Sequence, residues 1–141
     1  MSTYSTASKA KTIVRIHARV KDRQGVQPAI IYSSQLISLY HLSQQTSITY
    51  YTAIEAVREG SLRSINLENT FYVVRKLDKK TLPNDGESLD LVNSNQLVSA
   101  KYFAKKNGFS YRKVWHTVNE GLLPAVQIGN RLYIIEKPEV A

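Results

Sequence analysis

The chain has 141 residues, and its 19 Lys and Arg against 11 Asp and Glu give a formal net charge of +8 at pH 7. This length is enough for one ordinary domain or two very small ones, and it excludes a multi-domain enzyme. A hydrophobic share of 43% with a charged share of 21% indicates a folded, soluble chain rather than a disordered one. The excess of positive charge favours a nucleic acid or an anionic surface as partner and leaves an acidic substrate open.

The sequence contains no cysteine and three histidines. It therefore excludes disulfide scaffolds, cysteine-based zinc fingers, thiol catalysis and iron–sulfur clusters. The histidines lack metal-ligand spacing, so we predict no metal and no cofactor. No run of 18 apolar residues occurs, and we predict no membrane span. Residues 1–11 are polar, which indicates a flexible leader rather than a secretory signal and favours a cytoplasmic protein.

Residues 12–34 are predicted to form a β-hairpin with one basic face. From 14 to 21 apolar residues alternate with the basic side chains of Arg15, His17, Arg19 and Lys21. The segment 23–25 predicts the turn, and residues 29–32 predict the returning strand. A strand face of this kind either protects a sheet edge from aggregation or contacts phosphates, and the pattern leaves both open.

The chain also matches itself without a gap at an offset of 61 residues, with Gln35 to Val74 lying on Gln96 to Ile135. Ten of the forty aligned pairs are identical, where composition alone would give about two or three. We infer two copies of one small fold: copy one at 35–75 and copy two at 96–136. A linker at 76–95 joins the copies, and a tail follows at 137–141. This linker would allow the copies to orient independently or to pack as a fixed tandem.

Copy two shows the order of its elements clearly. Ser99 and Ser110 are predicted to cap two short helices, which Gly108 and Gly121 end. The runs 125–128 and 131–135 then flank a two-residue hairpin turn. The apolar stripe of the second helix is expected to pack into the core, and it includes Tyr111, Val114, Trp115, Val118 and, in copy one, the matching Tyr50.

Four stretches of copy two carry a resemblance to a known family: Leu97-Val-Ser-Ala-Lys-Tyr-Phe-Ala104, Phe109-Ser-Tyr-Arg-Lys-Val-Trp115, Glu120-Gly-Leu-Leu-Pro-Ala125 and Val126-Gln-Ile-Gly-Asn-Arg-Leu-Tyr133. They resemble the winged helix-turn-helix of the MerR and phage-excisionase superfamily. The resemblance implies an α+β protein with two tandem small winged helix-turn-helix units behind the β-hairpin. In that family the second helix enters the major groove of double-stranded DNA, and the wing tip touches the flanking backbone. Copy one departs from the pattern at Arg63 and Glu68, which indicates a degenerate reader.

The charge distribution selects the candidate DNA contacts. Residues 1–34 carry +5 and the repeated segment 96–135 carries +5, whereas the matching segment 35–74 carries −1. Arg112, Lys113 and His116 are predicted to lie at the end of the helix that meets base edges, and for Lys113 a phosphate contact is equally open. The other candidates are expected on phosphates or at the wing tip. The alternative for each is a solvated surface residue. The candidates in copy two are Lys101, Lys105, Lys106, Ser110, Arg112, Lys113, His116, Asn130 and Arg131. Additional candidates are Arg15, Arg19, Lys21, Tyr51, Thr52 and Arg58.

No catalytic or phosphate-loop motif is present in the sequence, so we predict neither an enzyme nor a small-molecule ligand. The sequence favours a sequence-specific, nucleoid-associated DNA-binding protein. Its role would be that of a transcription regulator, an excisionase-type recombination factor or a plasmid or phage partition-origin binder. Two alternatives stay open: a protein–protein adaptor built on winged-helix repeats, and an RNA-binding protein that uses the basic strand. A homodimer or a protein partner held through copy one is also open.

Overall fold

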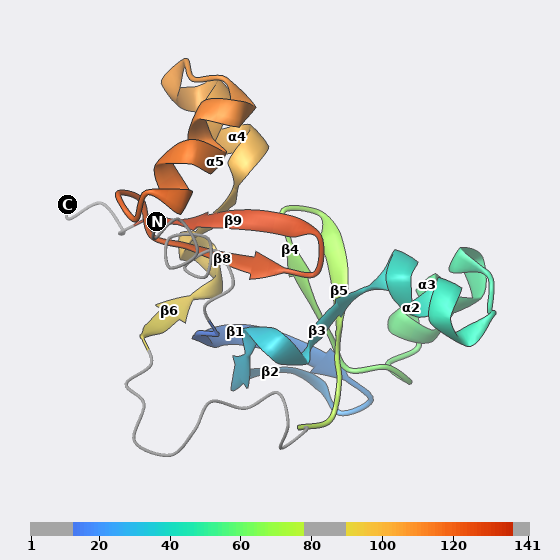
Figure 1. Cartoon of the computed structure of the whole chain (residues 1–141). Helices are drawn as coiled ribbons and strands as arrows, with labels where there is room; N and C mark the ends of the chain where they lie inside the picture. The colour runs from blue at the N-terminus through green and yellow to red at the C-terminus, as the bar shows by residue number, and fades with distance from the viewer. Residues whose placement is uncertain (1–12, 78–89, 137–141) are drawn as a thin grey trace.

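The computed structural model describes residues 13–77 and 90–136, and within them the chain is an α+β protein (Figure 1). One sheet has the strand order β2-β1-β4-β5-β3, with β6 pairing in parallel with β1. A second, antiparallel sheet has the order β7-β9-β8. Four α-helices lie outside these sheets in two pairs. The expected α+β class is therefore confirmed.

The N-terminal hairpin consists of β1 (Arg15–Asp22) and β2 (Gly25–Tyr32). Apolar and basic residues alternate along β1, and the apolar ones are buried while the basic ones are exposed. The turn is held by the Asp22 carboxylate, which accepts a hydrogen bond from the Gln24 N–H at 2.8 Å. β1 pairs with β2 on one side and with β6 and β4 on the other. It is an interior strand, so the interpretation of its basic face as sheet-edge protection is wrong.

Every element of copy one recurs in copy two 61 residues later. Each copy consists of a 3-10 turn, a short strand, two helices and a β-hairpin. In copy one these are η2 (Ser33–Gln35), β3 (Leu36–Ser38), α2 (Leu39–Thr46), α3 (Tyr50–Arg58), β4 (Ser64–Leu67) and β5 (Thr70–Val74). In copy two they are η3 (Ser94–Gln96), β7 (Leu97–Ser99), α4 (Ala100–Asn107), α5 (Tyr111–Asn119), β8 (Ala125–Ile128) and β9 (Arg131–Ile135). Copy two is preceded by β6 (Leu91–Asn93), which lies inside the expected linker.

The predicted helix ends agree with the structure. The Ser99 hydroxyl accepts a hydrogen bond from the Tyr102 N–H, and the Ser110 hydroxyl accepts one from the Lys113 N–H. Gly108 follows α4 with φ of 70°, in the left-handed region that glycine adopts at little cost. These short-range signals place both helices of copy two.

The same glutamine stands at matching positions of the two copies, as Gln35 and Gln96, and it makes the same two hydrogen bonds in each copy. Each side-chain carbonyl accepts a hydrogen bond from the backbone N–H three residues earlier, at 2.9 and 2.8 Å. Each side-chain amide donates to a carbonyl at the far end of its own copy, which is Arg75 O at 2.8 Å or Glu136 O at 3.2 Å. One glutamine therefore closes each copy by tying its first residue to its last.

Both copies share one buried core. It joins the inner face of β1 to the inner faces of the two copy hairpins, and we call it the shared core. Separate apolar clusters fill the space between each hairpin's other face and its own helices. Since β1 and both hairpins bury side chains in one cluster, the two copies form a fixed tandem, and independent orientation is excluded. The shared core contains Val14, Ile16, Ala18, Val20, Ile31, Leu36, Ile65, Leu67, Tyr72, Val74, Val92, Leu97, Val126, Ile128 and Tyr133.

At the centre of the shared core the two copies touch through the same residue of the repeat. Tyr72 and Tyr133 are both fully buried, and their hydroxyl oxygens lie 2.7 Å apart. Their rings meet edge to face, with centroids 6.2 Å apart. Because equivalent residues meet here and the hairpin tip of each copy also contacts the other copy, the copies are related by an approximate two-fold rotation.

Removing one hydroxyl from this pair is expected to deprive the other, which is buried, of its tyrosine partner. Tyr72→Phe or Tyr133→Phe should each lower the free energy of unfolding by about 1–3 kcal/mol. The double variant should lose clearly less than the sum of the two, because it leaves no orphaned hydroxyl. Urea denaturation of the parent and the three variants measures this. Additive losses would show that the two hydroxyls are not coupled.

The same pair predicts an alkaline limit to stability. Burial raises the pKa of Tyr72 and the pKa of Tyr133 above the ordinary value of 10.0. Above about pH 10 the unfolded chain releases these protons while the folded chain keeps them, so the free energy of unfolding falls as pH rises. Each tyrosine contributes a slope of about 1.4 kcal/mol per pH unit. Denaturation between pH 8 and 11 should therefore show a shallower decline for the double Phe variant, and equal slopes would contradict the assignment.

Candidate nucleic-acid interface

The helices α4 and α5 lie at one end of the molecule (Figure 1), and their charged side chains are basic. Neither helix contains an Asp or Glu. The buried side of the pair is small and apolar, and the basic side chains all lie on exposed positions. These exposed positions are Lys101, Lys105, Lys106, Arg112, Lys113 and His116. A helix pair whose own charged side chains are all basic attracts polyanions.

The N-terminal half of α5 carries the side chains that could meet base edges. Val114 and Val118 are buried against α4 and the hairpin, which turns Arg112 and His116 outward. Lys113 Nζ lies 4.5 Å from the centre of the Phe109 ring, so this lysine rests on an aromatic face. Phe109 is 42% exposed on the turn before α5, and the sequence pattern did not predict it as a site residue.

The expected core packing of Tyr111 and Tyr50 is wrong. Tyr111 is 42% exposed and Tyr50 is 47% exposed. Each is the first residue of its helix, and the valines and alanines further along supply the buried contacts instead. Tyr111 lies edge-on against the partly buried Trp115, with ring centroids 6.3 Å apart. Its phenol is therefore available at the same end of α5 as Arg112.

The lysines of α4 differ in their surroundings. Lys106 Nζ lies 3.9 Å from the Glu136 carboxylate, and this exposed pair offsets part of its charge. Among the described residues, Lys101 and Lys105 form no ion pair. Lys101 and Lys105 are consequently the better phosphate candidates on this helix.

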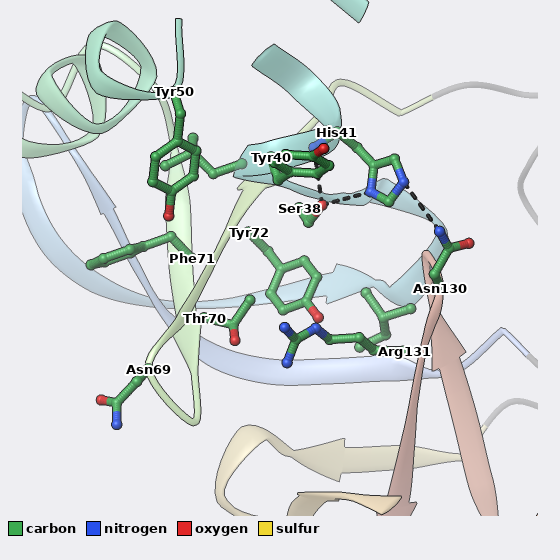
Figure 2. A pocket seen from close by; sticks show the side chains of 12 residues that line it. Ser38, Tyr40, His41, Tyr50, Asn69, Thr70, Phe71, Tyr72, Asn130 and Arg131 are labelled. Atoms are coloured by element: carbon green, nitrogen blue, oxygen red, sulfur yellow. Dashed lines mark hydrogen bonds between the residues drawn. The ribbon is translucent and has the colours of Figure 1, made fainter. Parts of the chain in front are cut away.

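The hairpin tip of copy two lies against copy one. Asn130 Nδ2 is 3.2 Å from His41 Nε2, and His41 Nδ1 is 2.8 Å from the Ser38 hydroxyl (Figure 2). Arg131 is exposed, and Figure 2 shows its guanidinium beside Tyr72. The tip is held at the junction of the copies rather than projecting past α5. The structure thus separates Asn130 and Arg131 from the other copy-two candidates.

Copy one offers a different surface on the same backbone. Tyr51, at 71% exposed, stands where copy two has Arg112, and Thr52 stands where it has Lys113. The Thr52 hydroxyl bonds the capping Thr49 hydroxyl at 2.9 Å. The Arg58 guanidinium lies 3.5 Å from the Glu55 carboxylate. None of the six basic positions is basic in copy one, which has Tyr40, Gln44, Gln45, Tyr51, Thr52 and Glu55 there.

The basic face of β1 forms a third group of candidates. Arg15, Arg19 and Lys21 are exposed on the side of β1 away from the shared core. The fourth member, His17, places Nδ1 3.2 Å from Asn93 Oδ1 on β6. The helices lie beyond the hairpins on the other side of that core, so the structure does not bring this group together with α4 and α5 (Figure 1).

Within residues 13–77 and 90–136, no three His, Asp or Glu side chains gather so that they could hold a metal ion. No helix in that part of the chain is long and apolar enough to cross a membrane. The exposed helix pair α4 and α5 carries guanidinium, ammonium and imidazole groups, which suit anion binding.

No protein-family model, no curated protein and no solved structure matches the chain.

Proposed function

We propose that this protein binds double-stranded DNA sequence-specifically, with copy two as the reader. The observation that carries the proposal is the exposed side of α4 and α5, where the two helices present basic side chains and contain no Asp or Glu of their own. The order of helix, helix and hairpin in each copy supports an assignment to the winged helix-turn-helix of the MerR and excisionase type. In this arrangement α5 is the helix that enters the major groove.

The chemistry of α5 divides the work between base edges and phosphates. Arg112 has the planar fork that pairs with the O6 and N7 acceptors of guanine. Lys101 and Lys105 on α4 contact the phosphates that flank the groove, and they supply affinity without sequence information. Ser110 caps the N-terminus of α5, where the helix dipole also favours a phosphate. The role is that of a transcription regulator, a recombination factor or a partition-origin binder, all of which need binding without catalysis.

Two substitutions separate base readout from phosphate binding. Arg112→Ala should relax the preference at one or two base pairs by about 1–3 kcal/mol, because it removes a bidentate donor. Lys105→Ala should weaken all duplexes about equally and reduce the slope of log K against log salt by about 1. Duplex selection followed by salt titration measures both effects. Gln44→Ala, at the position of copy one that matches Lys105, is the control and should bind like the parent.

The outcome of the selection also tests the alternatives. A random duplex pool that yields no enriched motif, together with parent-like behaviour of both α4–α5 variants, would overturn the proposal. Enrichment from a single-stranded RNA pool that depends on Arg15 and Arg19 would instead favour RNA binding through β1.

Copy one supports a second candidate function, the binding of a protein partner or of a second copy of this chain. Its helices carry an exposed, nearly neutral aromatic surface, with Tyr40 58%, Ile48 38%, Tyr50 47% and Tyr51 71% exposed. Tyrosines at low charge density are enriched in protein–protein interfaces.

Self-association through this surface predicts an effect that is independent of DNA. Tyr51→Ser should shift a parent dimer toward monomer by at least tenfold in dissociation constant, since a central interface tyrosine typically contributes about 2 kcal/mol. Sedimentation velocity across a range of protein concentrations measures this. Arg112→Ala serves as the control on the matching position of copy two. A parent that stays monomeric at high concentration would contradict self-association.

A further inference from the structure

The two hairpin tips make reciprocal contacts that differ in one chemical respect. Glu68, at the tip of the copy-one hairpin, places its carboxylate 2.9 Å from the Ser99 N–H at the start of α4. In the other half, the copy-two tip approaches the start of α2, where Ser38 corresponds to Ser99. The residue that corresponds to Glu68 is Gly129, which has no side chain. One half therefore supplies its own anion and the other half does not.

The strand registers show that the two positions are equivalent. Ser38 pairs with Tyr72 in the first sheet, and Ser99 pairs with Tyr133 in the second. Because both registers are the same, the Ser38 N–H takes the direction that the Ser99 N–H takes, toward the facing hairpin tip. The N-terminus of the eight-residue α2 adds the positive end of its dipole at this point.

An open cavity of about 520 Å³ lies at this position (Figure 2). None of its lining residues is acidic. It contains Arg131, which stands where copy one has Thr70, and no carboxylate among the described residues lies within 4.0 Å of this guanidinium. The half that lacks the internal anion thus has an added cation. The aromatic side chains of Tyr40, Tyr50 and Phe71 line the cavity together with the buried Tyr72.

We propose that this cavity binds a nucleotide through its phosphate. The phosphate occupies the position at the Ser38 N–H that the Glu68 carboxylate occupies at Ser99, and it pairs with the Arg131 guanidinium. The base lies among the rings of Tyr40, Tyr50 and Phe71. A volume of about 520 Å³ is in the range of small-molecule sites. The nucleotide is either a free mononucleotide or one nucleotide of a bound strand, and both present the same chemistry.

Gly129→Glu is the direct test, because it places in this half the carboxylate that the other half already has. Gly129 has φ of 61° and Glu68 has φ of 49°, so glutamate already adopts this backbone conformation at the matching tip. Binding of adenosine monophosphate, adenosine and inorganic phosphate to the full chain is followed by calorimetry. We expect adenosine monophosphate to bind at least tenfold more tightly than adenosine. Gly129→Glu and Arg131→Ala should each weaken it at least tenfold, with Arg131→Lys closer to the parent.

Arg23→Ala is the matched control, since it removes one exposed positive charge from the β1–β2 turn and should leave the affinity within twofold. Thermal unfolding of each variant checks the fold, and Arg131→Ala, on an exposed side chain, carries the test if Gly129→Glu is unstable. Binding of duplex DNA is measured as well, because it distinguishes a phosphate of bound DNA from that of a free nucleotide. If the phosphate belongs to bound DNA, Gly129→Glu weakens duplex binding and adenosine monophosphate competes; if it is a free nucleotide, duplex affinity is unchanged.

The proposal is overturned if Gly129→Glu and Arg131→Ala bind adenosine monophosphate and duplex DNA as the parent does, or if the parent binds neither phosphate nor mononucleotide and Gly129→Glu leaves duplex affinity unchanged. The cavity does not depend on α5. A failure of DNA reading at Arg112 therefore leaves this result intact, and a failure here leaves the Arg112 result intact.

Discussion

The buried contact between Tyr72 and Tyr133 is the constraint on which the arrangement of this protein depends. The hydroxyl groups of two fully buried tyrosines hydrogen-bond one another here, and a buried hydroxyl that loses its partner is costly. The hairpins that carry them must therefore meet at this point, together with the inner face of β1. That meeting sets the approximate two-fold relation of the copies, and through it the positions of all four helices.

The shared core also determines which contacts the hairpin tips make and which surfaces stay exposed. Each hairpin tip contacts the other copy. Glu68 of copy one accepts a hydrogen bond from the Ser99 N–H, and Asn130 of copy two contacts His41. The surfaces left for partners are the two helix pairs, the outer face of β1 and the cavity at the junction. On one backbone these pairs have diverged, with a cationic surface in copy two and an aromatic, nearly neutral one in copy one. The two copies thereby present two surfaces of different binding chemistry at a fixed separation.

The expectations that succeeded rest on short-range signals. The alternation along residues 14–21 placed β1, and serine and glycine at helix ends placed α4 and α5, because caps and strand periodicity act over three or four residues. The expectations that failed concern contacts between distant segments. Tyr111 lies on the apolar stripe of α5 yet is exposed, because the stripe reaches past the core beneath it. The basic strand is interior rather than an edge, because β6 and β4 pair with it from elsewhere in the chain.

The amino-acid sequence alone determines the repeat of 61 residues, the order of elements in each copy, the basic face of β1 and the fact that, of the two helix pairs, α4 and α5 carry the positive charge. Each of these follows from local periodicity, capping or charge counting, and none needs a partner segment to be known. The tertiary structure alone decides that Tyr72 meets Tyr133, that the hairpin tips turn inward, and that a cavity opens where Gly129 replaces Glu68. These depend on which apolar faces are buried against each other, and that choice is made by the joint packing of three segments distant in the chain.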